Sequence, residues 1–272
     1  MTSSPAKKPP TLWDHVVAKF RTVRFRCNIC GSPAKCDLFD MGRETSTCPA
    51  CRSTVRMRSI VHLVSMAVFG KGIALPDFPS RPDIRGIGLS DWDEYARRLA
   101  SSFNYTNTFY HQEPLLDITD VPDTMAGTCD FVISTDVFEH VTAPVSRAFD
   151  GALKLLKPGG TLVLTVPFMT EQSETREHFP NLHRFEVLGE GAGPFKLVNT
   201  RADGVVEEFD NPVFHGGPGE TLEMREFAKD SLRQELERAG FTAIRFADEP
   251  VREFGIYWRY PWSIPVVARA PG

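Results

Sequence analysis

The stretch from Cys129 to Phe168 constrains the fold of this chain more than any other feature. It begins with "CDFVIST", in which the apolar run Phe131 to Ile133 is typical of a strand buried on both faces. "PVSRAFDGALKLL" follows with apolar residues at helical spacing, and "KPGG" stops this helix because proline and glycine break regular structure. "TLVLTVPF" then indicates a second buried strand. A strand, a helix and a strand in this order predict a parallel sheet with helices packed on its faces.

The same alternation continues on both sides of this unit. Upstream, "IRGIGLS" indicates a strand and a turn, "WDEYARRLASSF" a helix and "YTNTFYH" another strand. Downstream, "SLRQELERAGF" indicates a helix ended by Gly240, and "TAIRFA" and "SIPVVARA" indicate two more strands. Residues 170–220 break the alternation with several glycine-rich stretches. We expect an inserted lid or substrate segment there, because long irregular segments in compact domains usually serve function.

Four of the six cysteines form two C-x-x-C pairs. Cys27 and Cys30 lie in "CNIC", Cys48 and Cys51 lie in "CPAC", and 17 residues separate the pairs. Each pair forms a tight knuckle that directs two thiolates to one point, so together they predict a closed, tetrahedral structural zinc site. Cys36 lies between the pairs as a spare thiol that could replace one ligand. "STVRMRSIVHLVSMAVF" then predicts a helix that leads into the next domain.

Composition limits the partners and the location that this chain can have. The net charge of −4 is not that of a general nucleic-acid binder, so the arginines around the cysteines are expected to form a solvated face. The longest apolar runs are too short for a membrane span. The first residues, "MTSSPAKKPPTLWDH", lack the apolar core of a signal peptide, so we expect a cytoplasmic protein.

"FVISTDVFEHV" and "LKLLKPGGTLVLTVPF" together resemble the class I S-adenosylmethionine-dependent methyltransferases, particularly their type-11-like branch. The resemblance implies an α/β fold with a Rossmann-like, doubly wound, seven-stranded sheet and an antiparallel C-terminal hairpin, here preceded by a small zinc ribbon. We accordingly expect a tail and leading helix over residues 1–22, a zinc-binding segment over residues 23–58 and a methyltransferase domain over residues 59–272.

The resemblance also implies where the cofactor binds. The family's first strand normally ends with an acidic residue and spaced glycines; here Gly86 stands at the acidic position, Gly88 matches the first glycine and Ser90 a later one. Backbone N–H groups of this turn would contact the methionine carboxylate of S-adenosylmethionine. Asp91 or Asp136 would replace the missing acidic residue.

Further cofactor contacts follow from the same resemblance. Asp117 would accept a hydrogen bond from the adenine amine and Ile118 would pack on the ring. Ser134 and Asp136 would lie beside the methionine half. The position of the usual ribose-binding acid falls near residues 109–110, which are phenylalanine and tyrosine, so the ribose partner stays open.

A hydroxyl acceptor would need a base to take its proton, and histidine is suited to this because its pKa lies near neutrality. His178, His183 and His215 follow the last strand of the central unit and are the candidates. Glu139 and His140 also look like a catalytic pair. In the family, however, this pair usually begins a helix and shapes the wall of the cofactor site.

We therefore expect an S-adenosylmethionine-dependent methyltransferase that acts on a hydroxyl of a small-molecule acceptor, such as a sugar or another natural product. Aromatic residues near the C-terminus could stack such an acceptor or simply pack a hairpin: Tyr257, Trp258, Tyr260 and Trp262. One alternative is an RNA methyltransferase with the zinc ribbon as nucleic-acid grip. Another is a degenerate, non-catalytic binding module, which the incomplete first turn and the missing ribose acid suggest.

Overall fold

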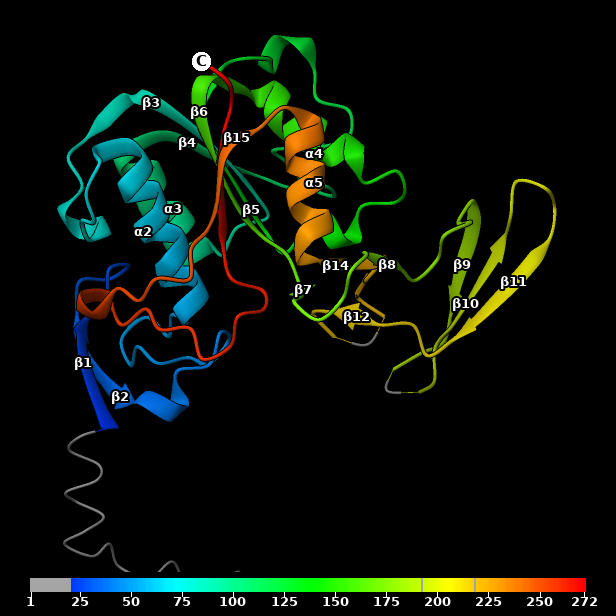
Figure 1. The fold of residues 1–272 in the computed structure, drawn as a ribbon, viewed down its shortest axis with the longest axis horizontal. Helices are drawn as coiled ribbons and strands as arrows, with labels where there is room; N and C mark the ends of the chain where they lie inside the picture. The colour runs from blue at the N-terminus through cyan, green and yellow to red at the C-terminus, as the bar shows by residue number, and fades with distance from the viewer. Residues whose placement is uncertain (1–20, 192, 218) are drawn as a thin grey trace, which may run out of the picture.

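A six-stranded sheet lies at the centre of the computed structural model, which describes residues 21–191, 193–217 and 219–272 (Figure 1). Its strands, in spatial order, are β15 (Thr242–Phe246), β16 (Val266–Arg269), β6 (Leu156–Thr165), β5 (Cys129–Thr135), β3 (Arg81–Leu89) and β4 (Phe103–Thr108). β4, β3, β5 and β6 are parallel, whereas β16 is antiparallel to both β6 and β15. The Rossmann-like α/β fold and its antiparallel C-terminal hairpin are thereby confirmed.

Helices cover both faces of this sheet (Figure 1). α2 (Val55–Phe69) and α3 (Asp93–Ser102) lie on one face, and α4 (Ser146–Leu155) and α5 (Lys229–Ala239) lie on the other. α4 buries Ala148, Phe149, Ala152 and Leu155, which recur at the spacing of one helical face. The side chains of each strand alternate between the two faces, so the sheet is the middle layer of two cores.

The sheet has six strands in the described residues, one fewer than the seven expected. After β4 the chain makes a single parallel bridge between Phe109 and Leu115 and passes through the 3₁₀ turn η3 (Asp123–Met125) to β5. A further strand with its crossover helix needs roughly 30 residues, and residues 109–128, interrupted by Pro114 and Pro122, are too few. β4 is consequently an edge strand.

The segment over residues 170–220 is built of short strands rather than irregular loops. β9 (Arg184–Leu188), β10 (Lys196–Thr200) and β11 (Val206–Asp210) form an antiparallel sheet that projects from the central layers (Figure 1). β7 (Phe168–Met169), β8 (Arg176–Glu177) and β14 (Arg225–Ala228) form a second sheet, and β12 (Phe214–His215) pairs with β13 (Thr221–Leu222). A small core of Phe179, Leu197, Leu222 and Met224 holds this part together.

The N-terminal segment shares its core with the central sheet. β1 (Thr22–Arg26) and β2 (Pro33–Asp37) pair antiparallel, and the 3₁₀ turns η1 (Leu38–Asp40) and η2 (Leu75–Asp77) flank α2. Cys27 and Cys48 belong to the same buried cluster as Leu99 and Phe131. The expected tail and leading helix lie outside the described residues, except for residues 21–22. No helix in the described part of the chain has the length and apolarity to cross a membrane.

Candidate functional site

The carboxyl ends of the parallel strands form the edge where ligands bind in sheets of this kind. Ser90 after β3 and Asp136 after β5 both have a left-handed backbone with φ of 54°. The Ser90 N–H donates to Thr108 O at 2.8 Å, and the Asp136 N–H donates to Thr165 O at 2.8 Å. These bonds pin the chain to neighbouring strands where it turns away from the sheet.

Gly86 and Gly88 lie inside β3 and make room for side chains. A Cβ on Gly86 would come within 2.2 Å of the Phe131 ring, and one on Gly88 would come within 1.9 Å of Tyr105 Oη and 2.2 Å of Asp91 Oδ2. Packing therefore explains both glycines. The turn itself begins at Ser90, so Gly86 and Gly88 lie within the strand and not in the turn.

Asp91, the first residue beyond this turn, is held in a buried polar network. Tyr95 donates to Asp91 Oδ1 at 2.7 Å, Thr135 donates to the same oxygen at 3.2 Å and Tyr105 donates to Oδ2. The side chain of Asn107 bonds both backbone groups of Asp91. Burial raises the pKa of Asp91 to about 7, although the three hydroxyl donors oppose that rise.

Asp136 is paired with two arginines of the cysteine-containing segment. Arg43 Nη2 lies 2.7 Å from Asp136 Oδ1, and Arg56 Nε lies 3.5 Å from Oδ2. Thr165 also donates to Asp136 at 2.9 Å, and Glu44 contacts both arginines. Burial alone would raise the pKa of Asp136, but the two guanidinium groups keep it below its ordinary value. Two cations and two carboxylates thus lie together at the sheet edge.

The remaining predicted cofactor residues follow β4 or end β5. Asp117 Oδ1 accepts from the N–H and the hydroxyl of Thr119, as in an ordinary aspartate turn. Ile118 is buried in the core beneath α4, where its carbonyl oxygen would meet a Cβ on Gly151 at 1.8 Å. Ser134 at the end of β5 is fully buried, and its hydroxyl has no hydrogen-bond partner.

A second polar group gathers around the 3₁₀ turn η4 (Phe138–His140), which follows β5. Five residues form it, and we call them the histidine–glutamate cluster: Glu139, His140, His178, His215 and Glu223. His140 Nε2 lies 3.1 Å from His215 Nδ1, and the same two nitrogens lie 3.7 and 3.5 Å from Glu139 Oε1. Glu223 bonds His215 Nε2 at 2.6 Å and His178 Nε2 at 2.9 Å.

The two carboxylates of this cluster differ in their electrostatics. Burial raises the pKa of Glu139 to about 7. Burial would also raise the pKa of Glu223, but hydrogen bonds from His178 and His215 lower it to about 2. The neighbouring carboxylates of Glu139 and Glu223 raise the pKa of His215 to about 10. A positive charge is therefore stabilised between the two carboxylates.

The structure brings together two of the three histidines predicted as bases. His178 and His215 belong to the cluster, whereas His183 is exposed in the inserted segment, where its N–H donates to Asn199. No sequence pattern indicated Glu223, which is 45 residues from His178. Arg43 was missed in the same way, because its contact with Asp136 spans 93 residues.

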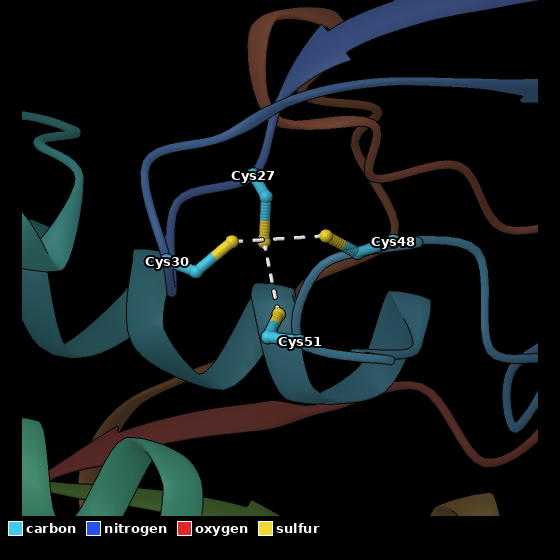
Figure 2. A group of neighbouring side chains, drawn as sticks. All are labelled: Cys27, Cys30, Cys48 and Cys51. Carbon is cyan, nitrogen blue, oxygen red and sulfur yellow. Dashed lines mark hydrogen bonds between the residues drawn. The ribbon is translucent and has the colours of Figure 1, made fainter.

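The four cysteines of the C-x-x-C pairs converge on one point (Figure 2). The Sγ atoms of Cys27 and Cys51 are 3.6 Å apart, and those of Cys30 and Cys48 are 3.7 Å apart. Sulfurs bound to zinc in a tetrahedron at about 2.3 Å would lie about 3.8 Å apart. Cys36 is not among the residues whose ligand atoms come together.

Arg58 supplies a buried positive charge beside these thiols. Its guanidinium is fully buried and donates to the carbonyl oxygens of Ser53, Phe254 and Gly255 and to the hydroxyl of Thr47. All these partners are neutral, so the group needs a nearby countercharge. Four thiolates around a divalent ion would provide it, because that complex carries two net negative charges.

The match to a family model agrees with this architecture. A family model described as a methyltransferase domain matches residues 70–245. No curated protein matches the sequence. Among solved structures, the sugar N-methyltransferase KedS8 from Streptoalloteichus is 13% identical, with 100% of this chain and 98% of that chain covered and a TM-score of 0.44. CalS10, an amino pentose methyltransferase from Micromonospora echinaspora, is 13% identical, with coverage of 80% and 92% and a TM-score of 0.45.

Proposed function

Because this chain belongs to the methyltransferase-domain family matched over residues 70–245, we propose that it methylates a hydroxyl oxygen of a sugar or another small natural product. S-adenosylmethionine is the methyl donor of this family. The arrangement that carries the proposal is the histidine–glutamate cluster directly after β5, at the carboxyl edge of the sheet. A hydroxyl acceptor, unlike an already nucleophilic amine, requires such a group to lose its proton.

The charged groups at the sheet edge suit the amino-acid half of the cofactor. Arg43 and Arg56 would hold its carboxylate, and Asp136, with Asp91 nearby, would hold its ammonium group. The unpartnered hydroxyl of Ser134 offers one further contact. When bound, S-adenosylmethionine supplies an electrophilic methyl group. The fit rests on these charges and not on a glycine cradle, because side chains of the protein itself fill the space beside Gly88.

The acceptor's hydroxyl would lose its proton to the histidine–glutamate cluster, in which Glu139, with a pKa of about 7, is the group that can take up a proton near neutrality, since His215 is already positively charged. Glu139 is fully buried, whereas the His215 side chain is 33% exposed, so the cluster is reached from the side of His215. His178 and Glu223 orient His215 by a chain of hydrogen bonds. This arrangement would place the acceptor oxygen beside the end of β5.

An exposed aromatic pair could hold the body of the acceptor. Tyr260 and Trp262 are stacked, with ring centroids 6.0 Å apart and an interplanar angle of 19°. Both rings are partly open to solvent. They lie on the segment whose Ser263 carbonyl accepts from Arg43 at 2.8 Å, which connects them to the sheet edge. Such rings stack on the apolar face of a sugar or on an aromatic acceptor.

The arginines near the cysteines give little support to an RNA substrate. Arg21 pairs with Asp37, Arg26 pairs with Asp77, and Arg56 pairs with Glu44. Arg58 is buried. Arg24 and Arg52 are exposed, but the paired and buried arginines neutralise few phosphates, so a small acceptor is the better proposal.

We also propose that Cys27, Cys30, Cys48 and Cys51 bind a structural zinc ion. The spacing of their sulfurs and the buried cation of Arg58 support this assignment. A site with four protein ligands leaves zinc no open position for a substrate. Reduced thiols of this kind suit the cytoplasm, the location that we propose.

A screen of hydroxyl-bearing sugars and small natural products tests the proposal. The full chain with its metal is mixed with S-adenosylmethionine, and formation of S-adenosylhomocysteine is measured. We expect turnover with a hydroxyl acceptor, loss of at least about tenfold in Glu223→Gln and unchanged cofactor binding in that variant. Glu226→Gln, which removes an exposed pair with Arg176, serves as the control. Methylation of RNA with no small acceptor used would refute the proposal, as would full activity of Glu223→Gln.

A further inference from the structure

We propose that Glu139, His140 and His215 bind a second divalent metal ion, of the transition-metal class, at the carboxyl edge of the sheet. The role of this ion rests on the hydroxyl methylation proposed above. Its binding can be tested without any substrate. The four-cysteine site is separate and lies in the N-terminal segment.

The three ligand atoms have the spacing of a metal's coordination shell. Glu139 Oε1, His140 Nε2 and His215 Nδ1 form a triangle with sides of 3.1, 3.5 and 3.7 Å. Nitrogen and oxygen ligands held tetrahedrally at about 2.0–2.2 Å lie roughly 3.4 Å apart. An ion at the centre of this triangle would therefore reach all three atoms without rearrangement of the side chains.

The other nitrogen of each imidazole already has a hydrogen-bond acceptor. His140 Nδ1 lies 2.8 Å from the carbonyl oxygen of Leu222, and His215 Nε2 lies 2.6 Å from a Glu223 carboxylate oxygen. With N–H groups at these positions, His140 Nε2 and His215 Nδ1 face each other and Glu139, so a bound ion would take the place of the proton that His215 Nδ1 otherwise holds. Histidines that bind metals are oriented in this way, by a carbonyl or carboxylate on the opposite nitrogen.

The environment of Glu139 is independent evidence for a cation at this position. Its side chain is fully buried, and neither carboxylate oxygen has a hydrogen-bond partner. A buried carboxylate without donors is costly, and such groups in proteins usually pair with a cation or coordinate a metal. His140 Nε2 and His215 Nδ1 lie 3.7 and 3.5 Å from Glu139 Oε1 and would be co-ligands.

The backbone around Glu139 is fixed, as a preformed site requires. The Met224 N–H donates to the Glu139 carbonyl oxygen at 2.8 Å. The buried guanidinium of Arg225 donates to the carbonyl oxygens of Phe138 and Val141, on the two sides of the turn. Glu177 in turn bonds Arg225 at 2.6 Å. The ligands are thus positioned before any ion binds.

Three protein ligands leave at least one coordination position for the acceptor. The side chain of His215 is 33% exposed and that of His140 is 16% exposed, so the free position faces the accessible side of the cluster. A hydroxyl oxygen bound there would have its pKa lowered by the ion. With the ion bound, its proton would leave to water and not to the cluster. The alkoxide would then form a bond to the methyl carbon as the bond from sulfur to that carbon breaks, and the electron pair would leave on the sulfur of S-adenosylhomocysteine.

Metal content of the full chain tests the proposal directly. Protein loaded with zinc and freed of loosely bound ions should retain two ions per chain. Glu139→Gln and His215→Ala should each retain one, and His111→Ala, which changes an exposed histidine outside the cluster, should retain two. Retention of the four-cysteine ion also shows that each variant is folded.

Zinc X-ray absorption of the unmodified protein gives a readout that does not depend on a variant. We expect a sulfur shell mixed with a nitrogen and oxygen shell, and sulfur alone in His215→Ala. One ion per chain with sulfur ligands alone would overturn the proposal. A proton, and not a metal ion, would then lie between His140 and His215. Calorimetry with S-adenosylhomocysteine is run in parallel, because lost cofactor binding would count against the methyltransferase proposal and not against the metal site.

Discussion

At the scale of single residues, side chains of the protein fill the space beside the glycines of β3. A cofactor loop was expected to leave that space open. Gly86 and Gly88 are small because Phe131, Tyr105 and Asp91 pack against them. A sequence shows that glycines are present, but not which side chain approaches each one. The positions of the glycines could therefore be predicted from the sequence, but their packing role could not.

Gly86→Ala should destabilise the fold by about 1–3 kcal/mol, because its methyl group would overlap the Phe131 ring in a filled core. Urea unfolding of the variant and of the unmodified protein measures the change. Gly193→Ala is the matched control, since the nearest atom to its Cβ would be a carbonyl oxygen at 3.2 Å. Equal stability of Gly86→Ala and the unmodified protein would contradict the packing account.

Asp91 should make stability depend on pH. Its folded pKa of about 7 exceeds its ordinary value of 3.8, so the folded state holds the proton more tightly. The resulting stabilisation is fully present below the unfolded pKa and is lost as pH rises through the folded one. The free energy of unfolding of Asp91→Asn minus that of the unmodified protein should therefore grow by up to about 1.4 kcal/mol per pH unit between about pH 4 and 7. Urea titrations across this range would show a constant difference if Asp91 ionises normally.

At the scale of elements, short sequence patterns predicted the helices and strands whose formation depends on local sequence. The helical spacing in "SRAFDGALKL" and the apolar run in "CDFVIST" correspond to α4 and β5. A seventh strand was expected but is absent from the described residues, because residues 109–128 are too few and contain two prolines. The short strands around residues 170–220 were not predicted, because several of them pair with distant segments. β14, for example, pairs with both β7 and β8, which lie far from it in the chain.

The two cysteine knuckles should stabilise the N-terminal segment through their metal. Cys48→Ser removes one of the four convergent ligands and should cost several kcal/mol, because metal-binding free energy becomes folding free energy. Cys36→Ser should retain the ion and the stability of the unmodified protein, since Cys36 lies outside the group. Zinc content and thermal unfolding measure both variants. Loss of zinc from Cys36→Ser with retention by Cys48→Ser would contradict the ligand assignment.

At the scale of the whole molecule, the cysteine-containing segment is part of the candidate cofactor site. Arg43 and Arg56 extend from it to Asp136 at the end of β5, and its core merges with that of one face of the sheet. The spacing of the cysteines predicted their convergence, and the family resemblance predicted the sheet. The contact between these two parts could not be predicted, because no local pattern encodes it.

Removal of the four-cysteine metal should therefore weaken cofactor binding, although none of its ligands contacts Asp136. We expect at least about a tenfold loss of affinity after chelation, in His215→Ala as well as in the unmodified protein, because Arg43 and Arg56 lie between and beside the cysteine pairs and depend on their position. Re-addition of zinc should restore the affinity. An unchanged affinity in zinc-free, folded protein would show that the segment is separate from the site.

Calorimetric titration of S-adenosylmethionine into the metal-replete full chain tests the central claim most directly. The titration is repeated with Asp136→Asn, and with Asp123→Asn, which changes an exposed aspartate paired with Lys154, as the control. We expect micromolar binding to the unmodified and control proteins and binding at least about tenfold weaker to Asp136→Asn. Absence of binding to the folded, unmodified protein would contradict a cofactor site at the ends of β3 and β5.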